Sequence, residues 1–553
     1  MVCFRWRTIG ALFTMAILGA SVTLQVPTLA AKDKASGSAS TADKAAKKKR
    51  SEKRPSTHSA DPAPSADDVS SGGSSAISVG GGGGIAGGGS GTQPGSTKQS
   101  SGSVPTGNVR QEPVAKAKTP ASSRKGATGR SALNSSRAPL NATHPLVKKV
   151  IDVQNRNHSS LSSQKGIVGT ATGLDGDGNV VIRVYTTGAD SPQIPDQIEG
   201  VAVLPVLTGP VRFAQGIGSS QLRPPTPAPI GVSTFVNTQG QIAVACQGNV
   251  GTVGCRMIDN NRNIYALSCN HVFAGNQLIV ASFNQATQVS TDQTVAFFPA
   301  GTQILQPAGS DVGCVTPVNK LSNILGTLFV ANPFYSTYTD PQTGLPVLTS
   351  ANKPNLCDCA LASTSASALD TATPTDGYGI PTDNYVPATL GMAVQKYGAA
   401  TRLTTGTVAA LNATYSIQVD ISTQNVLIKQ SFTTSVVNGT VVTTYVAGFA
   451  GNVNVTFTQQ VEVIPAGSSG AFAQSGDSGA LVVDASKNPT ALVQALGLSP
   501  NVFCGDFNNV KTTLVQAIAL ATGAQVALHV DTGASSLQQS LDGKVGRGTP
   551  NTQ

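Results

Sequence analysis

The sequence predicts a mainly β protein that follows a long unstructured N-terminal segment. From about residue 230 to residue 531, short apolar runs rich in Val, Thr and Ile alternate with turn residues, without long stretches of helical periodicity. A region of this size can bury a large core, so the pattern favours a β-barrel or a β-sandwich. A proline-rich joint at residues 223–229 separates it from a smaller folded unit.

The N-terminal residues have the pattern of an export signal. Residues 1–31 contain two arginines, an apolar run and then small residues, as a signal peptide does. The run is short for a membrane span, although an uncleaved N-terminal anchor stays open. We therefore expect a secreted or envelope-bound protein with no transmembrane span after signal cleavage. Residues 536–553 are expected to form a flexible tail.

The next segment carries the positive charge of the chain. Residues 32–143 are rich in Ser, Gly, Ala, Pro and Lys, and their few apolar side chains cannot offset the entropy of ordering, which predicts a disordered linker. Residues 32–150 contain 19 Lys and Arg against 7 Asp and Glu (+12), whereas residues 151–553 contain 16 against 21 (−5). Such a basic segment is either a solvated spacer or a contact for an anionic envelope polymer, and it indicates no specific nucleic acid.

A small α+β module is predicted for residues 144–222. The β-rich run 180–185 follows Asp175-Gly176-Asp177-Gly178, which is typical of a hairpin turn, and residues 201–204 add a strand. The Asp-Gly-Asp-Gly sequence also resembles part of a calcium-binding loop. The turn is preferred because the further ligand positions of that loop are missing.

The large domain is expected to span residues 230–535. Strands are predicted at residues 241–246, 263–268 and 277–281, and the strongly alternating stretch 413–464 predicts a β-hairpin that turns at Asn438-Gly439. One helix is predicted near the end, at residues 510–521, where small and branched apolar residues share a face.

Seven cysteines remain once the signal peptide is removed. They are Cys246, Cys255, Cys269, Cys314, Cys357, Cys359 and Cys504. In an exported protein they suggest disulfides with one thiol left over, and the sequence leaves the connectivity open. Cys357-x-Cys359 lacks the usual spacing of zinc ligands, so we expect neither a metal nor another cofactor.

Ser478 is the candidate nucleophile. It lies in Gly476-Asp477-Ser478-Gly479, where glycine allows a tight turn in which the amides of Gly476 and Ser478 point at a substrate carbonyl oxygen. A serine hydroxyl is a weak nucleophile unless a neighbouring base takes its proton. The hypothesis therefore requires a histidine and an acid elsewhere in the chain.

One histidine and one aspartate fit these roles best. His271 follows an apolar strand directly, whereas His529 lies within an alternating strand and is expected to be structural or exposed. Asp358 stands among small and apolar residues, where burial is costly unless the carboxylate is paired, for instance with an imidazole N–H. Asp311 is the competitor, but its glycine-rich context is more typical of a turn.

The three motifs resemble those of the chymotrypsin-like serine peptidases of exported bacterial type. The resemblance is carried by residues 267–272 (Leu-Ser-Cys-Asn-His-Val), residues 357–362 (Cys-Asp-Cys-Ala-Leu-Ala) and the Gly-Asp-Ser-Gly motif, in that order. Residues 396–408 look like a Gly- and Thr-rich strand of bacterial trypsin-like members. The module from residue 169 to residue 209 is similar to one that precedes such peptidase domains.

The resemblance implies a double β-barrel with the catalytic residues in the cleft between the barrels. Ser478 would attack a peptide carbonyl, His271 would take and return the proton, Asp358 would orient His271, and the Gly476 and Ser478 amides would hold the oxyanion. Phe472 corresponds to the base of the substrate-side-chain pocket, so a preference for Lys or Arg is unsupported. Asp477 would pair with a buried positive group.

Two alternatives to a serine endopeptidase that acts on peptides or proteins stay open. The spacings His271–Asp358 (358 − 271 = 87 residues) and Asp358–Ser478 (478 − 358 = 120) are long, so insertions that block the cleft would give a catalytically silent binding or scaffold protein at the envelope. An esterase of the α/β-hydrolase type is disfavoured, because it uses GxSxG and the chain order Ser, Asp, His.

Overall fold

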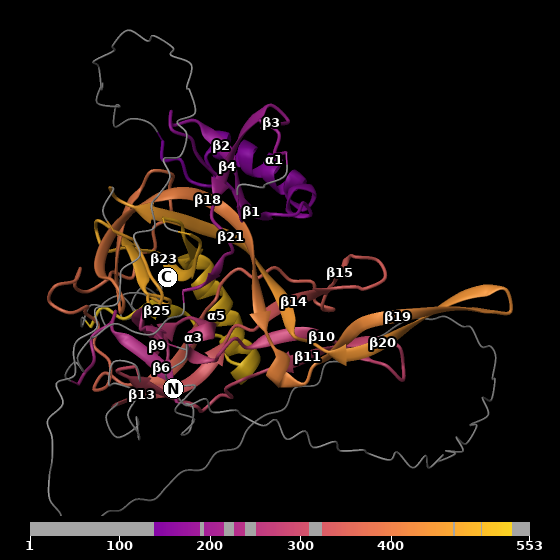
Figure 1. Ribbon diagram of the computed structural model, residues 1–553. Coiled ribbons are helices and arrows are strands. Elements are labelled where there is room, and N and C mark those ends of the chain that lie inside the picture. The colour runs from indigo at the N-terminus through magenta and orange to yellow at the C-terminus, as the bar shows by residue number, and fades with distance from the viewer. Residues whose placement is uncertain are drawn as a thin grey trace, which may run out of the picture. The chain divides into compact units, whose positions relative to one another are not determined.

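The structure is a computed structural model that describes residues 138–188, 193–214, 226–237, 250–308, 323–467, 470–498 and 500–533 (Figure 1). The predicted signal peptide, most of the linker and the tail lie outside these residues, as do the predicted strand 241–246, Cys246, Asp311 and Cys314. The described part is mainly β, as predicted. None of its helices is both long and apolar enough to span a bilayer.

A small α+β unit opens the described chain. Its elements are α1 (Pro145–Ser162), β1 (Ile167–Leu174), β2 (Val180–Thr186), β3 (Gln197–Ile198) and β4 (Val201–Leu207). β1 and β2 form an antiparallel hairpin, β4 runs parallel to β2, and α1 packs against β1 and β2. We refer to residues 138–207 as the N-terminal module.

Local chemistry explains how α1 begins and how the hairpin turns. Pro145 opens the helix, where its missing N–H costs nothing, and the His144 side chain accepts a hydrogen bond from the Leu146 amide. In the hairpin, the Asp175 carboxylate accepts hydrogen bonds from the Asp177 and Asn179 amides, both at 2.9 Å. The turn predicted for residues 175–178 is therefore confirmed.

The first half of the large domain is an eight-stranded sheet that closes into a barrel. Its strands are β6 (Ser233–Val236), β7 (Gly251–Thr252), β8 (Cys255–Asp259), β9 (Ile264–Ser268), β12 (Gln303–Gln306), β13 (Asn323–Ala331), β16 (Ala360–Thr364) and β25 (Leu528–Val530). Only Val253 and Gly254 separate β7 from β8. This run therefore pairs with β6 at one end and with β9 at the other, which closes the order β6-β12-β13-β16-β9-β8.

The second half of the large domain forms a six-stranded barrel. Its strands are β17 (Ala393–Gly398), β18 (Arg402–Asp420), β21 (Asn452–Pro465), β22 (Leu481–Asp484), β23 (Pro489–Leu496) and β24 (Val502–Asp506). The barrel closes because β21 pairs with both β24 and β18. The large domain is thus a double β-barrel, the fold class that the sequence resemblance implied.

The predicted helix near the C-terminus is confirmed as α5 (Phe507–Thr522). The Asp506 carboxylate caps it by accepting hydrogen bonds from the Asn508 and Asn509 amides, and Gly523 ends it in the left-handed conformation. Val510, Leu514 and Ile518 bury its apolar face in the core of the first barrel.

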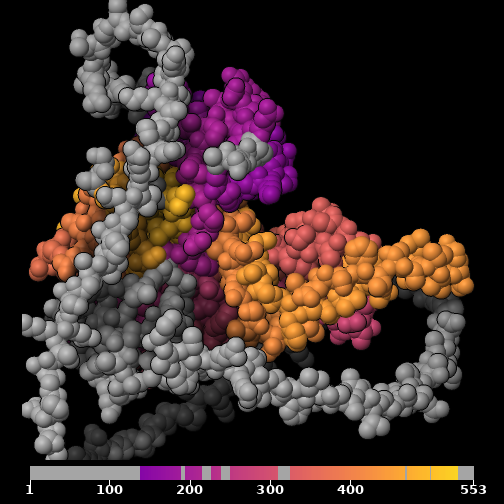
Figure 2. Space-filling model, in the orientation of Figure 1, coloured from indigo at the N-terminus to yellow at the C-terminus, as the bar shows by residue number. Residues whose placement is uncertain are grey.

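β18 and β21 run beyond the second barrel and carry the predicted hairpin. The added elements are β10 (Leu278–Asn284), β11 (Val289–Val295), β14 (Phe334–Thr339), β15 (Pro346–Val347), β19 (Leu427–Val437) and β20 (Thr440–Phe449). Asn438 and Gly439 turn between β19 and β20 with positive φ angles of 51° and 77°, as predicted. This hairpin projects as the light-orange arm at the right of Figures 1 and 2.

The N-terminal module continues the sheet of the second barrel. β1 pairs antiparallel with β18, so that Gly169 lies opposite Tyr415 and Gly173 lies opposite Ala410. A Cβ at Gly169 would come within 2.1 Å of the Thr414 carbonyl oxygen, so this close approach of two strands requires glycine. The short strand β5 (Arg212–Phe213) then leads from the module to β23.

Candidate active site

His271 lies on one turn of helix, α3 (Asn270–Phe273), directly after β9 of the first barrel. Asn270 fixes this turn: its side-chain amide donates to the carbonyl oxygens of Gln277 (3.0 Å) and Asn332 (2.7 Å), and its oxygen accepts from the Gln277 amide (2.9 Å). The turn is fully buried, so its polar groups must be satisfied internally. The imidazole is therefore held in one place by the surrounding backbone.

The structure brings His271 and Asp358 together. The Asp358 Oδ1 atom accepts a hydrogen bond from the His271 backbone amide at 3.2 Å, and its Oδ2 atom contacts the imidazole Nδ1. Both side chains are fully buried. A carboxylate at Nδ1 keeps the proton on that nitrogen, so Nε2 is the atom that can accept a proton.

Asp358 is fixed by the two cysteines beside it, which are joined as a Cys357–Cys359 disulfide just before β16. Asn332 holds this loop, since its backbone amide donates to the Cys359 carbonyl oxygen and its side chain donates to the Cys357 carbonyl oxygen, both at 2.9 Å. The disulfide and Asn332 therefore fix the loop that carries Asp358.

The expectation of a single leftover thiol is wrong. Cys255, Cys269 and Cys504 are buried thiols outside any disulfide. Cys269 lies close to the pair, and the candidate ligand atoms of Cys269, His271 and Asp358 are all within 4.8 Å of one another. Burial and the nearby Asp358 charge raise the pKa of the Cys269 thiol. A protonated thiol is a poor metal ligand, so this cluster favours a histidine–carboxylate pair over a metal site.

Ser478 precedes β22 of the second barrel, in a turn that needs its two glycines. Gly476 and Gly479 have φ angles of 102° and 89°, which glycine adopts without strain. A Cβ at Gly479 would also come within 2.3 Å of the Ser268 hydroxyl oxygen. The Ser478 hydroxyl donates to the carbonyl oxygen of Gln494 (3.5 Å) in β23, and this hydrogen bond does not lead to His271.

Asp477 pairs with a buried cation, Lys396, which no sequence motif indicates. Lys396 of β17 lies 3.2 Å from its Oδ2 atom, and both side chains are fully buried. Thr401 donates to the same oxygen (2.7 Å), and the Ala400 amide donates to Oδ1 (2.8 Å). Burial lowers the pKa of Lys396 and the Asp477 charge opposes this shift. The Ser478 turn is thus anchored within the barrel.

Phe472 is also buried in the second barrel. The Thr404 hydroxyl donates to its carbonyl oxygen (2.7 Å), and the Lys396 Nζ atom lies 6.0 Å from the ring centroid. Phe472 belongs to the same buried apolar cluster as Val463, Val493 and Ala214. Phe472 thus belongs to the core of the second barrel, and its role at the base of a substrate-side-chain pocket stays a prediction.

A segment that no sequence motif indicates also lies on this site. Phe213 stacks on the His271 ring with centroids 4.6 Å apart and an interplanar angle of 28°. The Ala214 amide donates to the Gln494 carbonyl oxygen (3.0 Å), and the Ala214 carbonyl oxygen accepts from the Gly476 amide (2.7 Å). The sequence signal is weak, because Val211, Phe213 and Ala214 form a short run, interrupted by Arg212, that does not indicate where it docks.

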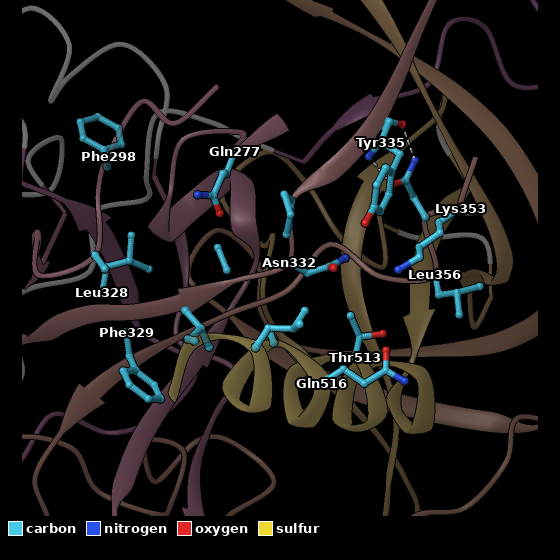
Figure 3. A pocket seen from close by; sticks show the side chains of 18 of the residues that line it. Gln277, Phe298, Leu328, Phe329, Asn332, Tyr335, Lys353, Leu356, Thr513 and Gln516 are labelled. Atoms are coloured by element: carbon cyan, nitrogen blue, oxygen red, sulfur yellow. Dashed lines mark hydrogen bonds between the residues drawn. The ribbon is translucent and has the colours of Figure 1, made fainter. Parts of the chain in front are cut away.

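A separate pocket of about 520 Å³ lies between β13, the segment before Cys357 and α5. Figure 3 shows Thr513 and Gln516 of α5 on one side of it and Lys353 and Leu356 on another. His271, Asp358 and Ser478 do not line this pocket. The candidate active site is instead the region where Phe213 packs on His271 and Ala214 contacts the Ser478 turn, and we refer to this region as the cleft.

No protein-family model matches the sequence, and no curated protein matches it. The chain is similar in part to the solved structures of Thermobifida fusca protease A (11% identity, 54% of this chain and 99% of that chain, TM-score 0.27), Cellulomonas bogoriensis chymotrypsin (13%, 55% and 97%, 0.25) and a Nocardiopsis protease (12%, 54% and 100%, 0.25). These values are too low to assign a family, so the case for the site rests on its own geometry.

Proposed function

We propose that the protein is an exported serine endopeptidase that hydrolyses peptide bonds through Ser478, His271 and Asp358. The observation that carries the proposal is the Gly476 amide, which donates at 2.7 Å to a peptide carbonyl oxygen beside the buried His271–Asp358 pair. A donor in this position would stabilise the negative charge that develops on the oxygen when a nucleophile attacks the carbonyl carbon.

Each residue has a defined role in the proposed reaction. Ser478 Oγ attacks the carbonyl carbon while His271 takes its proton, and Asp358 keeps the imidazole in the required tautomer. The oxyanion accepts hydrogen bonds from the Gly476 and Ser478 amides. His271 then gives the proton to the leaving amine, and water hydrolyses the acyl-enzyme ester by the same steps in reverse.

Localisation and other partners are part of the same proposal. Residues 1–31 would direct export, and the protein would act in the cell envelope or outside the cell on peptides or proteins. The basic segment before the folded part would attract an anionic envelope polymer by non-specific electrostatic attraction.

A fluorophosphonate probe, which reacts with activated serines, tests the proposal. The probe needs an open cleft, so it is applied to the full chain carrying Phe213→Ala, which removes the ring that covers His271. We expect labelling of this protein and no labelling once Ser478→Ala is added. Ser475→Ala is the matched control, because Ser475 is exposed in the same turn and should not affect labelling. Absence of labelling in the folded protein would refute the proposal.

Asp358→Asn tests the role of the acid in the same background. An asparagine in place of the aspartate favours the wrong imidazole tautomer, so we expect the labelling rate to fall on the order of 10⁴-fold. Asp383→Asn is the control, because Asp383 contacts the other histidine of the large domain, His529, at 2.6 Å. Equal labelling of the two variants would argue against Asp358 as the positioning acid.

The alternative is a silent binding or scaffold protein, and one observation favours it. The cleft is filled by the chain itself, as a permanently blocked peptidase fold would be. Opening the cleft should make Ser478 reactive in a peptidase and leave it unreactive in a silent binding protein. Labelling of the Phe213→Ala protein distinguishes the two functions.

A further inference from the structure

The segment that fills the cleft is bound in the manner of a substrate. Arg212 and Phe213 pair antiparallel with Leu496 and Ala495 of β23, and the Ala214 amide continues this ladder to the Gln494 carbonyl oxygen. An extended peptide that adds to a strand edge is a general mode of peptide recognition. The chain therefore offers its own backbone to the strand that borders the candidate nucleophile.

The Ala214 carbonyl group lies where the carbonyl group of a substrate's scissile peptide bond would lie, which packing of side chains alone would not require. The Ala214 carbonyl oxygen accepts the Gly476 hydrogen bond, and it belongs to the peptide bond that joins Ala214 to the next residue, Gln215. The Ser478 hydroxyl and the Ala214 amide both donate to the Gln494 carbonyl oxygen, at 3.5 Å and 3.0 Å. The candidate nucleophile and the Ala214 backbone thus converge on the same atom.

The side chains seal the cleft. Phe213 covers His271 and packs on Phe334 (5.7 Å between ring centroids) and Phe457 (6.1 Å). Ala214 is fully buried in the apolar cluster that contains Phe472, where there is room for a methyl group. A second peptide cannot pair with the same β23 atoms while this segment is bound, because each backbone group is already engaged.

The N-terminal module holds the segment in place. The module is joined to β18 through β1, and Arg183 and Tyr185 of β2 bind the buried Glu462 of β21 (3.1 Å and 2.7 Å). Residues 208–211 join β4 of the module to β5, beside a pocket of about 980 Å³ that Val211, Arg212 and Phe213 help to line. A segment tethered at such short range has a high effective concentration in the cleft.

We propose that residues 212–214 are a built-in substrate segment: they block the cleft of the intact chain, and Ser478 cleaves the chain after Ala214. This inference rests on the proposed peptidase function. The Ser478 oxygen would form an ester with the Ala214 carbonyl carbon, and the bond to the Gln215 nitrogen would break as His271 protonates that nitrogen. Water would then hydrolyse the ester and leave a carboxylate on Ala214.

Cleavage alone is not expected to open the cleft. The new Ala214 carboxylate would keep the Gly476 hydrogen bond, and the module would remain bound through β1 and Glu462. The Ser478 turn is anchored by Lys396, so its shape does not depend on a new N-terminus. The product should therefore be a two-piece complex that becomes active when the module dissociates.

The first measurement is intact mass and N-terminal sequencing of the purified full chain, incubated over a range of protein concentrations. We expect a fragment that begins at Gln215, formed at a rate independent of concentration, and no such fragment from Ser478→Ala. Ala214→Asp should abolish this cleavage, because a carboxylate cannot enter the buried apolar site. Ala202→Asp on exposed β4 is the matched control and should still be cleaved.

The second measurement is fluorophosphonate labelling of the same proteins. Phe213→Ala and Ala214→Asp should label at least about tenfold faster than the wild type, because an aromatic contact and a buried methyl group no longer hold the segment in the cleft. Rapid labelling of Ser478 in the wild type without cleavage at Ala214 would overturn the inference and leave the proposed function intact. Absence of both labelling and cleavage in every folded variant would instead overturn the proposed function.

Discussion

Two buried acids of the second barrel, Asp477 and Glu462, take their cations from different places. Asp477 pairs with Lys396, which belongs to the same barrel. Glu462 pairs with Arg183, which belongs to the N-terminal module, and also accepts hydrogen bonds from Tyr185 and Asn501. The turn that carries Ser478 is therefore complete within the barrel, whereas the surface that binds the module depends on the module for its charge balance.

The shape of the Ser478 turn and access to the cleft therefore depend on different parts of the molecule. Loss of the module would expose Glu462 to water and leave the Lys396–Asp477 pair buried and intact. The proposed peptidase would thus keep a formed Ser478 turn in either state, and the module with its segment 212–214 would control only whether the cleft is open. The following predictions are made in the Ser478→Ala background, which keeps the chain in one piece.

The largest effect is expected for Lys396→Met. Removal of the lysine leaves Asp477 buried without a cation, which typically costs roughly 3–5 kcal/mol of the free energy of unfolding. Chemical denaturation measures this loss. Lys511→Met is the control, because the Lys511–Asp383 pair is partly exposed and 3.8 Å long, and its loss should cost less than about 1 kcal/mol. An equal loss of the free energy of unfolding in the two variants would mean that the Lys396 charge does not stabilise the buried Asp477.

Arg183→Met should act on module docking rather than on the barrel. A docked module would then bury Glu462 without its cation, which typically costs roughly 2–5 kcal/mol. Hydrogen exchange of the β1 amides that pair with β18 should accelerate accordingly, while the amides of β22 and β23 keep their protection. Arg156→Met, which breaks an exposed pair within the module, is the control and should change neither set. Faster exchange in both sheets would show that the module also stabilises the barrel.

Tyr185→Phe should weaken docking less than Arg183→Met does. The phenol donates a 2.7 Å hydrogen bond to Glu462, and a hydrogen bond to a charged group is typically worth about 1.5–3 kcal/mol. The ring keeps its edge-to-face contact with Phe503, so the apolar packing is retained. The same β1 amides report the change. An effect as large as that of Arg183→Met would mean that the hydrogen bond from the phenol stabilises the buried Glu462 carboxylate as much as the guanidinium does.

The smallest effect is a pH dependence of docking above pH 10. Burial and the Glu462 charge raise the pKa of Tyr185 well above its usual 10.0 when the module is docked. Below pH 10 the hydroxyl is protonated in the docked and undocked forms, so its contribution is complete. Above pH 10 only the undocked form loses the proton, and docking weakens by at most about tenfold per pH unit.

The control for this pH dependence is Tyr185→Phe, which cannot ionise. The free energy of unfolding, measured for both proteins between pH 9 and pH 11, should fall more steeply in the protein that keeps Tyr185. Parallel curves would show that Tyr185 does not ionise on undocking.

Local sequence patterns predicted much of the fold. The Asn438-Gly439 turn and the helix predicted at residues 510–521 were confirmed because turn geometry and helix periodicity depend on neighbouring residues. His529 was correctly expected to be structural or exposed; it lies in β25 and contacts Asp383. The contact between His271 and Asp358 followed from the cost of burying a carboxylate without a partner. Their catalytic roles stay predictions.

Ion pairs between residues that are distant in the sequence could not be predicted in this way. Lys396 lies in an ordinary strand sequence, and only barrel closure brings it to Asp477. Glu462 and Arg183 are 279 residues apart, and neither has a neighbour in the sequence that indicates the other. Cys255, Cys269 and Cys504 are free thiols where a single leftover thiol was expected, because burial of a cysteine does not by itself bring two sulfur atoms within bonding distance.

The sequence by itself determined which reactive groups this protein carries: a serine between glycines, a histidine after a strand and an aspartate that needs a partner, in the order of the serine peptidases that the motifs resemble. Only the tertiary structure decided what lies in front of these residues. Residues 212–214 reach the cleft because β1 joins the module to β18 and because the C-terminal part of β23 extends beyond its pairing with β22. Such long-range pairing leaves no local trace in the sequence.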